Sequence, residues 1–310
     1  MTHPSPYLTR RTLMASAAAA PLAGLAATAH AEAPMLGNSF AQHRRFTIGA
    51  FEVTTILAGT TPREEPQGIF GMNVDADTFA EVSAANFLST EVSQFFFTPT
   101  MVNTGNELIL FDAGLNAAAT TAAIASAGYT PDQVDVVVLT HMHGDHFGGL
   151  MNDGAPTFAN ARYVTGQTEF DYWAGAENGG FESNVRPFAD QMTFIGDGGD
   201  VVTGVTGLNA FGHTPGHMVY RLESNGAGLA IFADLANHPV WSLARPDWEV
   251  RFDADKEAAA ASRRNILGMI AADRIPAIGY HMPFPATGYV APGTGDAEFH
   301  WVPEAGQLVG

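Results

Sequence analysis

A buried strand that runs directly into a cluster of histidines is the feature that most constrains this chain. The apolar residues 134–140 are followed at once by His141, His143, Asp145 and His146. Imidazole and carboxylate groups are the ligands that zinc and its neighbours in the first transition row accept. The glycines within and after this motif allow the tight backbone that lets neighbouring side chains point at one centre. The pattern predicts a metal site at the carboxyl end of a strand.

Three more residues of the same types stand at the ends of other apolar strands. They are His213, Asp234 and His281. In α/β folds, binding sites form at the carboxyl ends of strands. This repeated placement argues against the plainer interpretation, in which the residues of the first motif are only solvated loop residues.

Strand and helix signals alternate along the chain. Alternating apolar residues predict a strand over 46–57, and an Ala-rich stretch predicts a helix over 117–127. A second helix is expected from about Asp253, its N-cap, to residue 272. Further strands are predicted at 107–112, 134–140, 207–211, 218–223, 229–234 and 275–280. This order predicts a β-rich α/β fold.

Composition excludes several classes of function. The 310 residues include no cysteine, so the chain has no disulfide, no cysteine-ligated metal and no thiol nucleophile. The formal charge is -18, from 14 Lys+Arg against 32 Asp+Glu, and Lys256 is the only lysine. Nucleic acids and anionic lipid surfaces bind clustered cations. We therefore expect neither nucleic acid nor a membrane as a partner.

The start of the chain has the pattern of an export signal. A twin arginine at positions 10 and 11 precedes an Ala-rich apolar stretch, and Ala29-His30-Ala31 matches a small-x-small cleavage site. This pattern is typical of the twin-arginine route, and it predicts a periplasmic or secreted protein. We expect a signal over 1–31 and a single domain over 32–310. A homodimer, with residues 32–45 as a dimer arm, is left open.

Taken together, these motifs resemble the metallo-β-lactamase superfamily. The features that carry the resemblance occur in the family's order: the hairpin at the start, Phe111-Asp112-Ala113-Gly114, the 141–149 motif, the 213–217 motif, Asp234 and His281. The resemblance covers nearly the whole chain after the signal. It implies an αββα sandwich, in which two β-sheets pack face to face with helices outside and two metals sit at one edge.

The resemblance also assigns the ligands. It implies that His141, His143 and His213 hold one metal, that Asp145, His146 and His281 hold the second, and that Asp234 bridges them. Two divalent ions are expected, with zinc first and Mn, Fe or Co suited to the same ligands. Asp112 is either a residue that orients the ligand loop or a simple turn residue, and His217 either supports a ligand or is a loop histidine.

A mechanism follows from the implied pair of metals. Two cations about 3.5–4 Å apart lower the pKa of a shared water, and the resulting hydroxide attacks a carbonyl or phosphoryl centre without a side-chain base. We expect Asp145 to move a proton to the leaving group. Asp145 and Asp234 are thus the candidate catalytic residues.

The substrate class rests on finer resemblance. Residues 279–289 and the stretch around Trp173 look like the exported lactonase, arylesterase and methyl-parathion-hydrolase branch of the superfamily. There, an aromatic residue at the Trp173 position lines a pocket for apolar leaving groups; a core tryptophan is the alternative. Asn237 stands where the small-ring lactonases carry a tyrosine, which weakens a dedicated lactonase but leaves Asn237 as a candidate pocket donor. Phe95, Phe96 and Phe97 are expected in the core of a strand.

The favoured function is a dinuclear-metal hydrolase of small neutral esters, lactones or organophosphate triesters. An acidic chain disfavours an anionic substrate. One alternative is a β-lactamase-like or thioester hydrolase of the same superfamily. Alternatives of another class are a dioxygenase-type protein with one iron, and a metal-binding protein without catalysis. The complete set of seven expected ligands argues against both of the latter.

Overall fold

A computed structural model of the protein describes residues 35–37 and 39–305. The chain divides into two units, residues 1–39 and 40–310, and every element described below belongs to the second. The expected export signal and its cleavage after Ala31 lie outside the described residues. Within the described part of the chain, no helix has the length and apolar character needed to cross a membrane.

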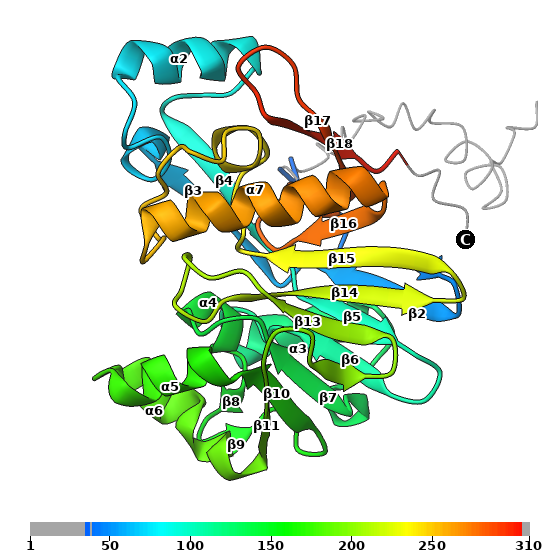
Figure 1. Ribbon diagram of the computed structural model, residues 1–310. Helices are drawn as coiled ribbons and strands as arrows, with labels where there is room; N and C mark the ends of the chain where they lie inside the picture. The colour runs from blue at the N-terminus through cyan, green and yellow to red at the C-terminus, as the bar shows by residue number, and fades with distance from the viewer. Residues whose placement is uncertain (1–34, 38, 306–310) are drawn as a thin grey trace, which may run out of the picture. The chain divides into compact units, whose positions relative to one another are not determined.

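Two seven-stranded sheets form the centre of the second unit (Figure 1). The first sheet has the order β1 (His43–Ile48), β2 (Phe51–Ile56), β5 (Thr100–Asn103), β6 (Leu108–Phe111), β7 (Val136–Leu139), β10 (Arg162–Gly166) and β11 (Met192–Ile195). The second has the order β12 (Asp200–Val202), β13 (Val205–Asn209), β14 (Met218–Ser224), β15 (Ala227–Ala233), β16 (Pro276–Gly279), β17 (Thr287–Pro292) and β18 (Phe299–Pro303).

The main core lies between the two sheets. Ile109 and Val136 of the first sheet share one buried cluster with Tyr220 and Ile231 of the second. Successive side chains of a strand point to opposite faces. The alternate residues of β6 and β7 therefore belong to a second cluster, on the outer face of the first sheet.

Helices cover the outer faces. α3 (Ala117–Ser126), α5 (Gln167–Gly175) and α6 (Gly179–Asn184) pack on the first sheet. α7 (Lys256–Asp273) crosses the second sheet, where its Leu267 and Ile270 are fully buried (Figure 1). The resulting layers are helix, sheet, sheet and helix, which confirms the predicted αββα sandwich.

A third cluster is formed by an excursion between the first strands. The hairpin of β3 (Gly59–Glu64) and β4 (Val92–Phe97) packs with α2 (Ala76–Ala85) around buried aromatic side chains, among them Phe70 and Trp241. The short elements are η1 (Pro66–Gly68), η2 (Pro131–Gln133), α4 (Gly144–Phe147), β8 (Met151–Asn152), β9 (Ala155–Pro156), η3 (Arg186–Gln191) and η4 (Pro239–Leu243). The sequence predicts the strand around Phe95, but it does not predict that β3, α2 and β4 form a cluster of their own.

Most of the predicted strands are present with ends shifted by one or two residues, but two expectations were wrong. Residues 46–57 are not one strand, because the chain turns at Gly49 (φ 57°) and forms the β1–β2 hairpin. α7 begins at Lys256 with Asp255 as its N-cap, so Asp253 is free for another contact. Residues 43–45, the last part of the segment left open as a dimer arm, belong to β1 and pair with β2.

Candidate metal centre

Four strand ends meet at one edge of the two sheets and carry the seven expected ligands. His141 and His143 follow β7, and the short helix α4 begins directly after them. His213 lies between β13 and β14, Asp234 directly follows β15, and His281 follows β16. The structure gathers them into two groups: His141, His143, His213 and Asp234 in the first, and Asp145, His146 and His281 in the second.

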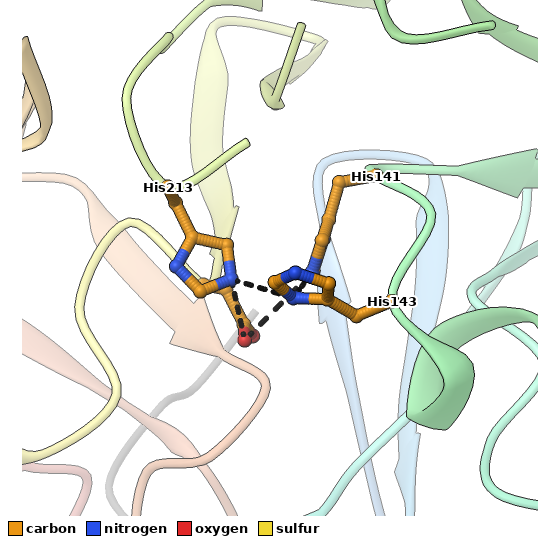
Figure 2. A group of neighbouring side chains, drawn as sticks. His141, His143 and His213 are labelled. Atoms are coloured by element: carbon orange, nitrogen blue, oxygen red, sulfur yellow. Dashed lines mark hydrogen bonds and ion pairs between the residues drawn. The ribbon is translucent and has the colours of Figure 1, made fainter. Parts of the chain in front are cut away.

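The first group is three imidazoles that face one another (Figure 2). The Nδ1 atom of His143 lies 3.1 Å from Nε2 of His141 and 3.1 Å from Nε2 of His213. Asp234 completes the group, with Oδ2 3.3 Å from Nε2 of His213. A cation at this centre would take these ring nitrogens and one carboxylate oxygen as ligands.

The second group shares Asp234 with the first. The Nε2 atom of His281 lies 3.3 Å from Oδ2 of Asp145 and 3.2 Å from Oδ2 of Asp234. The other oxygen of Asp234, Oδ1, lies 3.3 Å from Nε2 of His146. One carboxylate therefore contacts histidines of both groups, which is the placement that a bridging ligand requires.

In three of the histidines, the ring nitrogen that faces away from the centre forms a hydrogen bond, and this bond fixes which nitrogen faces the centre. Nδ1 of His281 donates to the carbonyl oxygen of Phe96 (2.8 Å), so its Nε2 presents a lone pair to the centre. Nδ1 of His146 pairs with Asp112 and Nδ1 of His213 with Asp253, at 2.8 and 2.9 Å. Metal-binding histidines in proteins are held by this kind of outer hydrogen bond.

Buried polar atoms without partners complete the test of fit. Among the described residues, Nε2 of His146 and Oδ1 of Asp234 are buried and have no hydrogen-bond partner. Burial disfavours a charged imidazole and lowers the pKa of His143 to about 3, so this ring is neutral at neutral pH. Burial also opposes charge on His213, but Asp234 and Asp253 outweigh it and raise the pKa of His213 to about 9. The carboxylates thus draw a positive charge into the centre, and the neutral ring of His143 offers a lone pair to it, as a metal site requires.

Asp112 and His217 both support the centre. Asp112 accepts from the backbone amide and the hydroxyl of Thr140, each at 2.9 Å, as well as contacting His146. It therefore orients the ligand loop, and is more than a turn residue. His217 accepts at Nε2 from the backbone amide of Asp234 (3.2 Å), so it positions that residue.

Two buried carboxylates near the centre were missed in the sequence analysis. Asp253 contacts His213 through one oxygen and Arg263 through the other, at 2.9 and 2.8 Å. Glu169, on α5, is completely buried and accepts from backbone amides in the loops of both motifs. Asp253 stands close to the true N-cap in sequence, and Glu169 lies in an amphipathic helix, so neither had a local signal for this role.

A cavity of about 420 Å³ opens onto the centre. Its floor includes His143, Asp145, Asp234 and His281. Its walls are largely apolar and include Phe95, Phe97, Leu115 and Phe252, with Arg63 also lining it. The predicted strand around Phe95 is confirmed as β4, but two of its three phenylalanines line the cavity as well as being buried, since alternate residues share a face.

The two predicted pocket residues do not line this cavity. Trp173 packs its ring against His143, with centroids 6.0 Å apart, and its Nε1 donates to Glu169 (2.7 Å). Asn237 is 2% exposed and donates from Nδ2 to Oδ2 of Asp234 (2.9 Å). Both side chains therefore contact expected ligands without lining the cavity. Helix α5 places Trp173 against His143, and the turn after β15 places Asn237 against Asp234.

Comparison with known proteins identifies the family of this chain. A sequence model described as the metallo-beta-lactamase superfamily matches residues 98–277, which is more than half of the chain. The chain belongs to that superfamily. The matched span contains six of the seven expected ligands, and His281 follows it by four positions.

Relatives in sequence and in structure are lactonases and hydrolases. An N-acyl homoserine lactonase of Bacillus thuringiensis is 33% identical over 104 residues, which is 34% of this chain and 39% of that protein. The Bacillus cereus N-acyl homoserine lactonase is 30% identical over 104 residues, again 34% of this chain and 39% of that protein. The chain thus matches about two fifths of the length of these curated relatives.

Solved structures of this superfamily share the fold over most of the chain. AidC, a dizinc quorum-quenching lactonase in complex with a product, superimposes with a TM-score of 0.77 at 22% identity, covering 85% of this chain and 97% of that one. The hydrolase AbOPH of the beta lactamase superfamily gives a TM-score of 0.78 at 23% identity, covering 86% of this chain and 99% of that one. At this level of identity, the likeness concerns the fold.

Proposed function

We propose that this protein is a dinuclear-metal hydrolase, with zinc the expected metal, that cleaves small neutral esters, lactones or organophosphate triesters. The observation that carries the proposal is Asp234, whose carboxylate contacts His213 of the first group and His146 and His281 of the second at the floor of an apolar cavity. Two divalent metals bound there would supply a nucleophile from water at neutral pH and would polarise the electrophilic centre. The lactonases and hydrolases among the relatives support this class of reaction.

The cavity supports an uncharged substrate with an apolar or aromatic part. Phenylalanine side chains and Leu115 line it beside the ligand groups. Burial of such a substrate part removes apolar surface from water, which contributes about 25 cal/mol for each Å² buried. Asn237 points at Asp234 and not into the cavity, so no phenol-like acid is offered to a lactone at this position.

The test is a hydrolysis panel run with metal analysis on the same sample. Aryl esters, lactones and phosphotriesters with aromatic or long acyl groups should turn over, and their short acyl counterparts should turn over more slowly. Two divalent metals per chain should accompany this activity. One iron and no zinc per chain, or zinc-loaded protein that cleaves none of the panel, would contradict the proposal.

We propose that Asp145 moves a proton from the attacking water to the leaving group. It lines the cavity, and its side chain is 23% exposed, against 4% for Asp234. A positioned acid contributes about 10²–10⁴-fold to a rate. We therefore expect Asp145→Asn to lower kcat by about 10²-fold or more on substrates with poor leaving groups, and by less on activated aryl esters. Metal content is measured alongside, and full activity at unchanged metal content would reject this role.

We propose that the protein is exported by the twin-arginine route, because a twin arginine and a small-x-small cleavage site stand at the start of the chain. A periplasmic or secreted location predicts that the mature protein begins after Ala31. Mass spectrometry of protein recovered from the periplasm of an expressing cell tests this directly, since uncleaved protein in the cytoplasm would contradict it.

A further inference from the structure

Glu169 joins the two loops that carry the first ligand group. Its Oε1 accepts from the backbone amide of Met142 (2.8 Å) and from Nε1 of Trp173 (2.7 Å). Its Oε2 accepts from the hydroxyl of Thr214 (2.7 Å) and the backbone amide of Gly216 (2.9 Å). Glu169 is 0% exposed, so these four hydrogen bonds are shielded from water.

The donors around Glu169 stabilise its ionised form, whereas burial raises the pKa of its carboxyl group. A backbone amide and an indole N–H can only donate, and three of the four partners are of these kinds. Each carboxylate oxygen therefore meets two donors, and an amide in this place would turn its NH2 group towards a backbone N–H that can only donate. Among the described residues, no arginine or lysine forms an ion pair with Glu169. A buried carboxyl group without an ionic partner is costly to keep, which indicates that its position serves a purpose beyond packing.

The contacts fall on one ligand group only. Met142 lies between His141 and His143, and Thr214 and Gly216 follow His213. Gly216 lets the second loop approach closely, because a Cβ at this position would lie 2.1 Å from the backbone nitrogen of Glu169. The three histidines of the first group are thus carried by two segments held to one carboxylate. The second group is held differently, through Asp112 and the carbonyl of Phe96.

We propose that Glu169 is a positioning residue for the first metal: it holds the loops of His141, His143 and His213 at the separation that this metal requires. The proposal rests on the proposed dinuclear centre. It assigns to Glu169 an effect on one site of the pair, whereas Asp112 contacts His146 of the other site and also Thr140 beside His141.

The experiment compares Glu169→Gln with Asp112→Asn and the wild type. Glutamine keeps the size of the side chain but turns an NH2 group towards either Met142 or Gly216, which can only donate. Zinc affinities are measured by competition with a chromophoric chelator, and the occupancy of each site by anomalous scattering from crystals equilibrated at fixed free zinc. Residues that hold a metal ligand in place typically change metal affinity by about 10–100-fold. We expect Glu169→Gln to weaken the first site by about that factor and to leave the second site at wild-type occupancy, while Asp112→Asn weakens the second site through His146.

A purely structural role would give a different result. The melting temperature of Glu169→Gln would then fall by the same amount with and without zinc, and both sites would keep their wild-type affinity; either finding overturns the proposal. If Glu169→Gln does not fold, Thr214→Val removes one donor to Oε2 and should weaken the first site severalfold, whereas unchanged affinity in this variant rejects the proposal. Wild-type protein that binds no zinc would instead contradict the dinuclear centre itself.

Discussion

Replacing Asp234 with asparagine should reduce hydrolysis by about 10³-fold or more, because several kcal/mol of transition-state stabilisation depend on the metals that it is placed to bridge. Asparagine has nearly the same shape but no charge. It would present a neutral amide to Nε2 of His146 on one side and to Nε2 of His281 on the other, where the carboxylate oxygens now lie at 3.3 and 3.2 Å. Metal content should fall from two ions per chain to one or none.

Asp153→Asn is the matched control for this substitution. It removes the same charge from an exposed residue in the β8–β9 turn, at a positive φ of 48° that asparagine tolerates. Its activity and metal content should equal those of the wild type. Two metals per chain and wild-type kcat in Asp234→Asn would show that the carboxylate does not bridge.

Removing the metals should destabilise the fold strongly. A ligand that binds only the folded state stabilises it by about 4.1 kcal/mol for each site at a free concentration of 1,000 Kd. Two sites together are therefore expected to raise the melting temperature by roughly 10 °C or more. The cation would lie among the ring nitrogens of His141 and His213, each 3.1 Å from Nδ1 of His143, so its removal takes away what these side chains are placed to hold.

Thermal unfolding with a chelator, and then with zinc restored, measures this effect. The Asp234→Asn variant serves as the control, because its melting temperature should respond much less to zinc. If chelated and zinc-loaded wild-type protein had the same melting temperature, the two groups of side chains would not bind metal tightly enough to stabilise the fold.

The sequence could predict the ligands because their signal is local. His141, His143, Asp145 and His146 share one short segment after a buried strand, and ligand chemistry restricts what such a segment can do. The strand end also fixes the edge of the sheet at which the site lies. His213, Asp234 and His281 occupy equivalent places on other strands, so the gathering of all seven followed from topology.

The supporting residues could not be predicted in this way, since their partners are distant in the chain. Asp253 and Asp255 are equally good N-cap residues by type, and only the packing of α7 beside the 213–217 loop decides that Asp253 binds His213. Asn237 is predicted to line the cavity because it stands where the small-ring lactonases carry a tyrosine. The turn after β15 instead directs its side chain back to the carboxylate of Asp234. The orientation of a side chain in a loop depends on contacts that spacing does not contain.

The excursion with α2 shows a related limit. Its segment has weak periodicity, and its stability comes from aromatic packing, such as Phe79 on Trp241 with ring centroids 5.1 Å apart. These two residues are 162 positions apart in the sequence. Tertiary contacts of this kind outweigh local propensity, and they also place β4 so that Phe95 and Phe97 reach the cavity.

Anomalous scattering at the zinc edge from crystals of zinc-loaded wild-type protein tests the central claim most directly. The account predicts two peaks: one among His141, His143 and His213, and one among Asp145, His146 and His281, with Asp234 in contact with both. A single peak, or peaks only at other places on the protein, would contradict a dinuclear centre built from these seven residues.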